Sequence, residues 1–256
     1  MNPSPFRSRR VVAAASHLFA SVAVAGVASI LVFAIWYPAP FAAIAAGGSL
    51  FLILVSVDVV LGPVLTAIAA DPAKSNKVFR RDLAVIIAIQ LAGFAYGIYS
   101  IALARPVYLV FEVDRMRVVT AADIEPEQLG DAPPNLRRLP WTGPEVIAAV
   151  RPTQPDEVLR SIDLALSGID ISLIPKYWRD FAAQKDAALR LSRPATELRS
   201  RYPEASGSLQ QIAAKAGQPF ESLRFLPVVS RQASWVALMT APEARVVGFL
   251  PLDGFF

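Results

Sequence analysis

The sequence contains no cysteine and only one histidine, His17, among its 256 residues. The lack of cysteine excludes disulfide bonds, thiol chemistry and cysteine-ligated metal sites. One histidine is too few for the usual zinc sites or for a His-based catalytic triad. The chain also lacks a Gly-rich phosphate loop followed by lysine, an H-E-x-x-H motif and a G-x-S-x-G motif. We therefore expect neither an enzyme nor a bound cofactor.

Charged residues are scarce in the first part of the chain. They make up 18% of the whole sequence, against about a quarter in an ordinary soluble domain. Residues 1–104 hold seven basic and three acidic side chains, whereas residues 105–256 hold 18 of each sign. The net charge of +4 therefore lies beside apolar segments and not on a soluble face, which argues against a nucleic-acid partner. This distribution predicts a membrane domain, 1–104, followed by a soluble domain, 105–256.

Three apolar segments are long enough to cross a bilayer, which takes about 20 residues. They cover approximately residues 11–36, 43–68 and 83–104. The first segment is longer than the apolar part of a secretory signal peptide, so we interpret it as a retained transmembrane helix. Trp36 ends this segment and Tyr37 follows it, where an aromatic anchor at the membrane interface is expected.

The basic residues of the short loops predict the orientation of these helices. Arg7, Arg9 and Arg10 precede the first segment, and four further basic residues lie between 74 and 81, whereas the loop 37–40 carries no charge. Because basic loops stay in the cytoplasm, we expect a cytoplasmic N-terminus and residues 105–256 on the opposite side. The Ala- and Arg-rich composition is typical of a bacterial protein, for which that side is the periplasmic face of the inner membrane.

Polar and ionisable side chains inside the apolar segments are candidates for a structural or functional role, because placing them in lipid costs free energy. At 1.5 Å per residue, His17 and Gln90 lie at similar depths in their helices, and Asp58 lies near the middle of the membrane. One interpretation is structural, with Asp58 held by His17 or Gln90 so that it keeps the helices in register. The other is functional: a proton-responsive site, or a docking point for a polar group on another protein's helix.

Small residues recur at four-residue spacing in two of the segments. Ser21, Ala25 and Ser29 share one helix face, and Gly93 and Gly97 form a G-x-x-x-G motif. Such faces allow helices to approach closely, either within this chain or with a partner. Both faces are therefore candidates for helix packing or for contact with a second protein.

The residues after 104 predict an α+β domain with an antiparallel sheet. Strands are expected at 107–113, 117–120, 223–229, 235–240 and 245–250, and helices at 155–169, 175–189 and 208–217. Trp141 lies in a corner between Pro140 and Pro144. It is a candidate contact residue for a partner, although a tryptophan beside proline more often packs into its own domain.

The order of several segments resembles the type IV pilin accessory proteins of the TfpX/TfpZ kind. The resemblance rests on V-D-V-V-L-G-P-V-L-T at 57–66, R-P-V-Y-L-V-F-E-V-D-R at 105–115, L-P-W-T-G-P at 139–144 and V-G-F-L-P-L-D at 247–253. It covers most of the chain and is weakest between about 150 and 225. Together these segments are specific, although none is specific alone.

The resemblance implies a non-enzymatic inner-membrane protein that acts alongside one major pilin, as a chaperone-like or assembly-modulating factor. It implies no active site. The expected partner is then the type IV major pilin, with its membrane helix meeting a small-residue face and its periplasmic head meeting the soluble domain. The alternative left open is a membrane sensor or regulatory subunit whose soluble domain binds a ligand.

Overall fold

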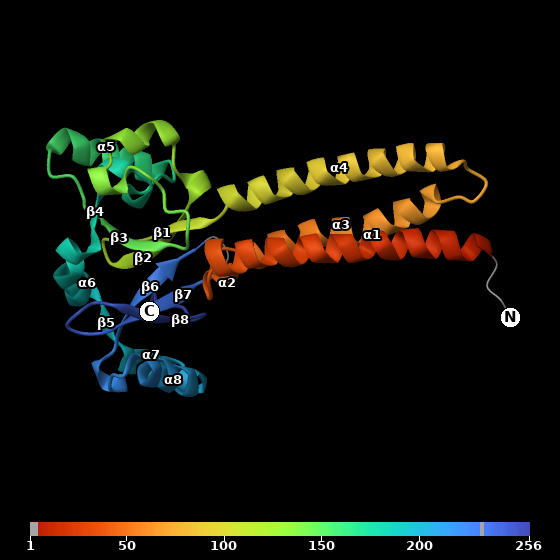
Figure 1. The fold of residues 1–256 in the computed structure, drawn as a ribbon. Coiled ribbons are helices and arrows are strands. Elements are labelled where there is room, and N and C mark those ends of the chain that lie inside the picture. Colours follow the sequence, from red (N-terminus) through yellow and green to blue (C-terminus); the bar gives the residue numbers. More distant parts are fainter. Residues whose placement is uncertain (1–4, 231–232) are drawn as a thin grey trace. The chain divides into compact units, whose positions relative to one another are not determined.

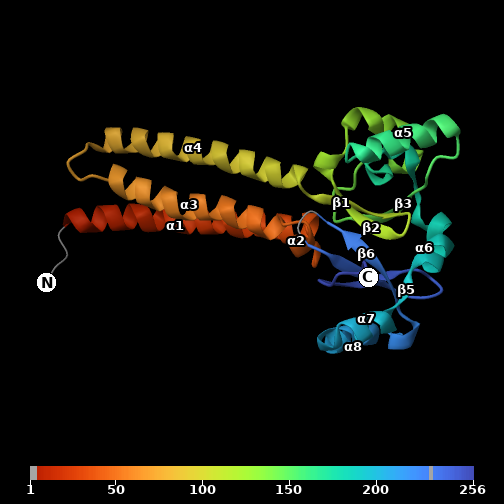
Figure 2. The ribbon, with the colours of Figure 1, turned by 180° about the vertical axis from the view of Figure 1, so that it is seen from behind.

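The computed structural model describes residues 5–230 and 233–256, and its contacts divide the chain into two compact units, Met1–Ala104 and Arg105–Phe256. The first unit contains three helices that are long and apolar enough to cross a membrane, and the second contains a β-sheet with surrounding helices (Figures 1 and 2). The predicted fold class, three transmembrane helices followed by an α+β domain, is confirmed.

The helices of the first unit differ from the predicted segments mainly at their ends. They are α1 (Pro5–Ile30), continued by a π-helical turn η1 (Leu31–Trp36), then α2 (Phe41–Ile44), α3 (Gly47–Ala69) and α4 (Asn76–Leu103). α4 begins at Asn76 instead of residue 83 because Ser75 caps it: the Ser75 hydroxyl accepts a hydrogen bond from the Val78 N–H at 3.4 Å. The charged residues 80–82 therefore lie within the helix and not in the preceding loop.

An aromatic cluster holds one end of this unit together. Trp36 and Tyr37 are 2% and 0% exposed, so both side chains pack inside the helical unit. The Tyr37 hydroxyl donates to the main-chain oxygen of Ile101 at 2.9 Å. Gly47 lies directly against the ring, where a Cβ would come within 2.4 Å of a Tyr37 carbon. Tyr37 therefore joins the start of α3 to the end of α4.

Basic residues lie at the opposite end of the unit. Arg9 donates to the Asn76 side-chain oxygen at 3.1 Å, and Arg10 lies 3.5 Å from the Asp71 carboxylate. The start of α1 therefore contacts the loop between α3 and α4 and the first residue of α4, and both ribbon views draw these segments at the same end of the unit (Figures 1 and 2). Both basic clusters lie at the same end of the helical unit, as a chain that crosses a membrane three times requires.

The second unit is built on a sheet whose strand order is β4-β3-β1-β2-β6-β7-β8, with β5 paired to β6. The strands are β1 (Pro106–Glu112), β2 (Arg115–Thr120), β3 (Glu145–Ala149), β4 (Trp178–Asp180), β5 (Arg193–Pro194), β6 (Arg224–Val229), β7 (Trp235–Met239) and β8 (Val246–Leu250). Most neighbours are antiparallel, but β1 pairs with β3 and β2 pairs with β6 in parallel. The sheet is therefore mixed but mostly antiparallel, as the predicted α+β domain requires.

Helices cover this sheet and link its strands. They are α5 (Pro155–Leu166), α6 (Lys185–Leu191), α7 (Ala195–Arg201) and α8 (Ser206–Ala216). Short 3₁₀ helices occur at Ala121–Asp123, Pro126–Asp131, Pro134–Leu136, Ile171–Leu173, Pro175–Tyr177, Phe181–Gln184, Pro203–Ala205 and Phe220–Ser222. The predicted helix 175–189 is wrong, because Trp178 begins β4, where it is fully buried and donates from Nε1 to the Ser172 oxygen at 2.8 Å.

Strand β1 lies at the centre of the domain core. All seven of its residues are buried, which is typical of a strand covered on both faces. Tyr108 packs edge-on against Trp178, with ring centroids 4.9 Å apart, and donates to the Arg138 oxygen at 3.3 Å. Burial, reinforced by the nearby Glu145 carboxylate, raises the pKa of Tyr108 to about 12. The phenol therefore remains a hydrogen-bond donor at any physiological pH.

Candidate functional site

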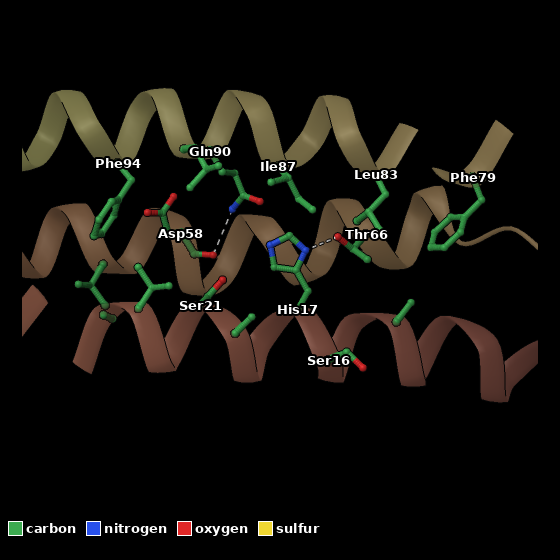
Figure 3. Close-up of a pocket in the computed structure, with 16 residues that line it drawn as sticks. Ser16, His17, Ser21, Asp58, Thr66, Phe79, Leu83, Ile87, Gln90 and Phe94 are labelled. Atoms are coloured by element: carbon green, nitrogen blue, oxygen red, sulfur yellow. Dashed lines mark hydrogen bonds between the residues drawn. The ribbon is translucent and has the colours of Figure 1, made fainter. Parts of the chain in front are cut away.

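A cavity of about 440 Å³ lies among α1, α3 and α4 in the helical unit (Figure 3). It is lined mainly by small and apolar side chains, with a polar group at its centre. The lining residues are Ala13, Ser16, His17, Ala20, Ser21, Val24, Ala25, Val55, Asp58, Thr66, Phe79, Leu83, Ile87, Gln90, Leu91 and Phe94. Because α3 packs against both α1 and α4, its inward face forms the base of this α1–α3–α4 cavity.

The polar residues of α3 follow one helix face. Asp58, Gly62 and Thr66 are spaced by four residues and so lie one above the other. Thr66 is 1% exposed, and its hydroxyl lies 2.6 Å from His17 Nδ1 on α1. The bond runs from Nδ1–H to the hydroxyl in one imidazole tautomer and from the hydroxyl to Nδ1 in the other. It links α1 to α3 inside the apolar unit.

Gly62 is the point where the side chains of α1 and α4 meet. A Cβ added to Gly62 would lie 2.4 Å from Gln90 Nε2 and 2.8 Å from His17 Nε2. With contacts this short, any side chain at position 62 would have to displace the ends of the Gln90 and His17 side chains. Glycine therefore lets His17 and Gln90 reach over α3 from opposite sides, as Figure 3 shows.

Gln90 connects α4 to the middle of α3. Its Nε2 donates to the main-chain oxygen of Asp58 at 3.4 Å, close to Pro63, which has no N–H to bond the carbonyl four residues before it. The other end of the amide, Oε1, is buried and accepts no hydrogen bond from any residue in 5–230 or 233–256. The Asp58 side chain lines the same cavity. This part of the cavity is therefore rich in hydrogen-bond acceptors.

The structure brings together the three polar residues that the sequence singles out, since His17, Asp58 and Gln90 all line the cavity. Of the two partners that the structural interpretation offers Asp58, Gln90 bonds it, through the Asp58 main-chain oxygen, whereas His17 bonds Thr66. Sequence reasoning did not include Thr66 or Gly62 in the site. The four-residue spacing that joins both to Asp58 was the available signal.

The two small-residue faces have different surroundings. Ser21 and Ala25 line the cavity, while the Ser29 hydroxyl donates to the Gly26 oxygen of its own helix at 2.7 Å. A Cβ at Gly97 would lie 2.4 Å from a Leu54 methyl carbon, so this glycine serves packing between α3 and α4. A Cβ at Gly93 would meet nothing within 4 Å, and that position is open to a partner.

The soluble unit exposes large apolar side chains in several places, among them Trp141 and helix α5. Trp141 is 60% exposed and lies beside the Arg105 guanidinium, 5.4 Å from the ring centroid. On α5, Leu159, Ile162 and Leu166 are 64%, 51% and 84% exposed. The expected contact residue Trp141 is thus at the surface and not in the core.

Within the described residues, no group of three or more His, Asp or Glu side chains is placed to hold a metal ion. The polar residues of the α1–α3–α4 cavity are instead suited to hydrogen bonding. They lie in an apolar setting where a satisfied hydrogen bond is strong and an unsatisfied group is costly.

Comparison with known proteins gives one family match and three relatives, all described as fimbrial assembly proteins. Residues 5–46 match the model of the family described as "Fimbrial assembly protein FimB". The chain is 33% identical over 241 residues to "Fimbrial assembly protein, serogroup I" of Dichelobacter nodosus, covering 93% of each chain. It is 32% identical over 241 residues to "Fimbrial assembly protein, serogroup E1" of the same organism, again covering 93% of each chain. It is also 41% identical over 116 residues to "Fimbrial assembly protein, serogroups C1 and C2" of that organism, covering 45% of this chain and 88% of the relative. No solved structure matches the chain.

Proposed function

Since the chain is 33% identical to one such protein over 93% of both lengths, it belongs to the family of fimbrial assembly proteins, and we propose that it is a non-catalytic accessory protein for a type IV pilin. In this proposal it resides in the bacterial inner membrane and assists its pilin, chaperone-like, before or during assembly into the pilus. This is the role implied by the resemblance to the TfpX/TfpZ proteins.

The α1–α3–α4 cavity is the observation that carries the proposal. A pilin subunit awaiting assembly is a membrane helix with a periplasmic head, so its partner needs a helix-binding surface within the bilayer. The cavity offers small side chains on α1, including Ala20, Ser21 and Ala25, and polar groups on α3 and α4. Small residues and hydrogen-bonding side chains are the features by which helices associate in lipid.

The position of the basic residues supports the orientation in this proposal. Arg9 and Arg10 share one end of the helical unit with Lys74, in the loop between α3 and α4, and with Lys77, in the first turn of α4. That end is placed in the cytoplasm by the positive-inside rule. The soluble unit is then periplasmic, and the exposed Trp141 and the apolar stripe of α5 are surfaces available to the pilin head.

The orientation is testable because the chain has no native cysteine. We expect Ser167→Cys to react with a membrane-impermeant maleimide in cells whose outer membrane alone has been permeabilised. We expect Ala73→Cys to react only after the inner membrane is opened. Both positions are exposed, so accessibility does not differ for structural reasons. The reverse pattern of labelling would place the soluble unit in the cytoplasm and overturn the proposed orientation.

Photocrosslinking tests the pilin partner. Val24 and Leu91 line the cavity and are 47% and 59% exposed, whereas Val22 and Ile89 lie outside its lining and are 52% and 68% exposed. Each pair is two residues apart on one helix, so its members point to nearly opposite sides at almost the same depth. We expect p-benzoyl-phenylalanine at 24 or 91 to capture the major pilin at least about fivefold better than at 22 or 89. This ratio corresponds to a free-energy difference of about 1 kcal/mol. Equal capture within both pairs, or no capture of pilin at any position, would contradict the proposal.

A further inference from the structure

We propose that the loop 138–144 of the soluble unit binds the surface of the bilayer, with the Trp141 ring among the lipid headgroups and the Arg138 guanidinium on the phosphates of anionic phospholipids. This inference goes beyond the proposed function, because it concerns the membrane and not the pilin. It is carried by the position of Arg105 in the chain, by the contact of Arg105 with Trp141, and by the exposure and charge of the loop. It leaves the apolar stripe of α5 as the surface available to the pilin head.

Arg105 marks the level at which the chain leaves the apolar part of the membrane. The last part of α4, residues 83–103, carries no charged side chain, and at 1.5 Å per residue it is about 30 Å long. This length equals the thickness of the hydrocarbon core of a bilayer, which is also about 30 Å. Arg105 follows Ala104, the C-cap residue of α4. Chain continuity alone therefore places Arg105 at the level of the headgroups.

Two contacts within the soluble unit hold the loop 138–144 beside this point. The Arg105 guanidinium lies 5.4 Å from the centroid of the Trp141 ring. Tyr108, three residues after Arg105, donates from its hydroxyl to the Arg138 main-chain oxygen at 3.3 Å. Trp141 therefore lies at the same end of the soluble unit as the start of β1, where the chain enters this unit from the membrane.

The loop is built so that its tryptophan stays outside the domain core. Leu139 packs against the core of the soluble unit, while Pro140 and Pro144 restrict the main chain on either side of Trp141. The Trp141 side chain is 60% exposed. An indole combines a large apolar ring with one polar N–H, and for this reason tryptophan is enriched at membrane–water interfaces.

The other tryptophans of the chain are packed inside the two units. Trp36 and Trp178 are 2% and 0% exposed, and Trp235 is half-buried on β7, where it packs against the core. Tyr37, which the sequence places at the interface, is also buried in the helical unit. Trp141 is therefore the tryptophan that can enter the headgroup region at the end of α4.

The charge of the loop favours anionic lipid over a neutral surface. Residues 132–144 contain two exposed arginines, Arg137 and Arg138, and no acidic residue, the nearest in sequence being Asp131 and Glu145. A guanidinium group forms paired hydrogen bonds with phosphate oxygens, and basic residues next to a membrane are attracted to anionic headgroups. Arg137 already donates from Nε to a main-chain oxygen at 3.1 Å, so Arg138 is the residue assigned to the phosphate.

The test uses the full-length protein, without pilin, in nanodiscs of phosphatidylcholine or of phosphatidylcholine mixed with phosphatidylglycerol. Because the chain has no native cysteine, bimane can be attached at Thr142→Cys in the loop or at the control Ala122→Cys, both exposed positions. Ala122 follows Ala121, whose N–H donates to the Arg105 oxygen at 3.0 Å, so the control lies near the same point of the chain but on another segment. We expect lipids with a nitroxide on the headgroup to quench bimane at 142 at least about threefold more strongly than at 122.

Substitutions in the loop identify the groups that make the contact. We expect Trp141→Ala to reduce the quenching at 142 to the level at 122, and Trp141→Tyr to retain it, because tyrosine also favours the interface. Arg138→Gln, or omission of phosphatidylglycerol, is expected to lower the ratio of bound to unbound loop, read from the quenching at 142, about fivefold, the factor for one arginine at an anionic surface. Arg160→Gln, at an exposed position on α5, is the matched control and should have no effect. Because Trp141 is exposed, the unfolding midpoint of Trp141→Ala should stay within about 2 °C of wild type.

Three results would overturn the proposal. Equal quenching at 142 and 122, or quenching at 142 that Trp141→Ala leaves unchanged, would mean that the loop lies near lipid without binding it. Quenching that responds neither to phosphatidylglycerol nor to Arg138→Gln would mean that the phosphate is not recognised. Weak quenching at 142, combined with pilin capture by p-benzoyl-phenylalanine at 141 in cells, would assign the loop to the pilin head instead. Since the nanodiscs contain no pilin, failure of the lipid contact leaves the proposed function standing, and crosslinking from 24 and 91 tests that function separately.

Discussion

Replacing Arg117 by leucine is expected to destabilise the soluble unit by about 3–5 kcal/mol, the effect of removing one partner from a buried ion pair. Glu112 is almost fully buried, its side chain being 5% exposed. Its carboxylate accepts from Arg117 Nε and from the Ser172 N–H, both at 3.3 Å. Arg117 also bonds the Asp170 carboxylate through Nη2. Without the guanidinium, Glu112 keeps its charge in the core with a single main-chain donor.

The measurement is thermal unfolding of the full-length protein in detergent, followed by tryptophan fluorescence. We expect the midpoint of the Arg117→Leu variant to fall by about 10 °C, because 1 kcal/mol shifts a unit of this size by about 2–4 °C. Arg115→Leu is the matched control on the same strand. Its ion pair with Asp114 is 38% and 50% exposed, so its removal is expected to cost less than about 1 kcal/mol.

A double substitution separates the charge effect from a loss of packing. Glu112→Leu combined with Arg117→Leu removes both charges and is expected to recover much of the stability lost in Arg117→Leu alone. If the double variant is as unstable as the sum of both single variants, the ion pair is not the cause. Normal stability of Arg117→Leu would contradict the prediction directly.

The sequence predicts the helical unit well because length and hydrophobicity alone define a membrane-spanning helix. It misplaces the start of α4, since the charged residues 80–82 end the apolar segment although the helix continues to its cap at Ser75. It also does not reveal that Trp36 and Tyr37 are buried within the unit. Their burial depends on contacts with Ile101 and Gly47, which lie far along the chain and leave no local pattern.

The sheet is predicted less completely, and the reason is again sequence separation. The β1–β2 hairpin and the β6–β7–β8 meander connect neighbouring segments, so alternation and turn residues indicate them. The parallel pairs β1–β3 and β2–β6 join strands that are distant in the chain. The error at 175–189 has a similar origin, because Trp178 and Phe181 there have helical spacing but pack into the core through β4 and a 3₁₀ turn.

The polar site shows what can and cannot be predicted by counting residues from the helix ends. Counting residues from the helix ends predicts that His17, Asp58 and Gln90 can meet, and all three line one cavity. The count does not say which atoms bond, because that depends on helix rotation. The count also does not reveal that Gly62 makes room for side chains of two other helices.

The largest functional effect is expected from Gly62→Leu. Any Cβ at this position overlaps Gln90 Nε2 and His17 Nε2, at 2.4 and 2.8 Å. Both of these atoms belong to the ends of side chains that can rotate away, so α3 itself is expected to persist. The added side chain would displace the amide from Asp58 and fill part of the cavity. Overpacking of this kind costs typically about 1–3 kcal/mol, which three packed helices can tolerate.

We therefore expect Gly62→Leu to remain in the membrane at near-normal abundance but to lose pilin capture from position 91 to the background seen at position 89. Gly62→Ala should give an intermediate loss, because its single methyl displaces the same two side chains but occupies less of the cavity. Gly26→Leu is the control, since a Cβ there meets nothing within 4 Å. Because α3 supplies the base of the cavity while α1 and α4 supply its sides, a defect confined to position 62 would show that the partner depends on the interior of the cavity. A defect of equal size at position 26 would instead indicate that the outer surface of the helices makes the contact.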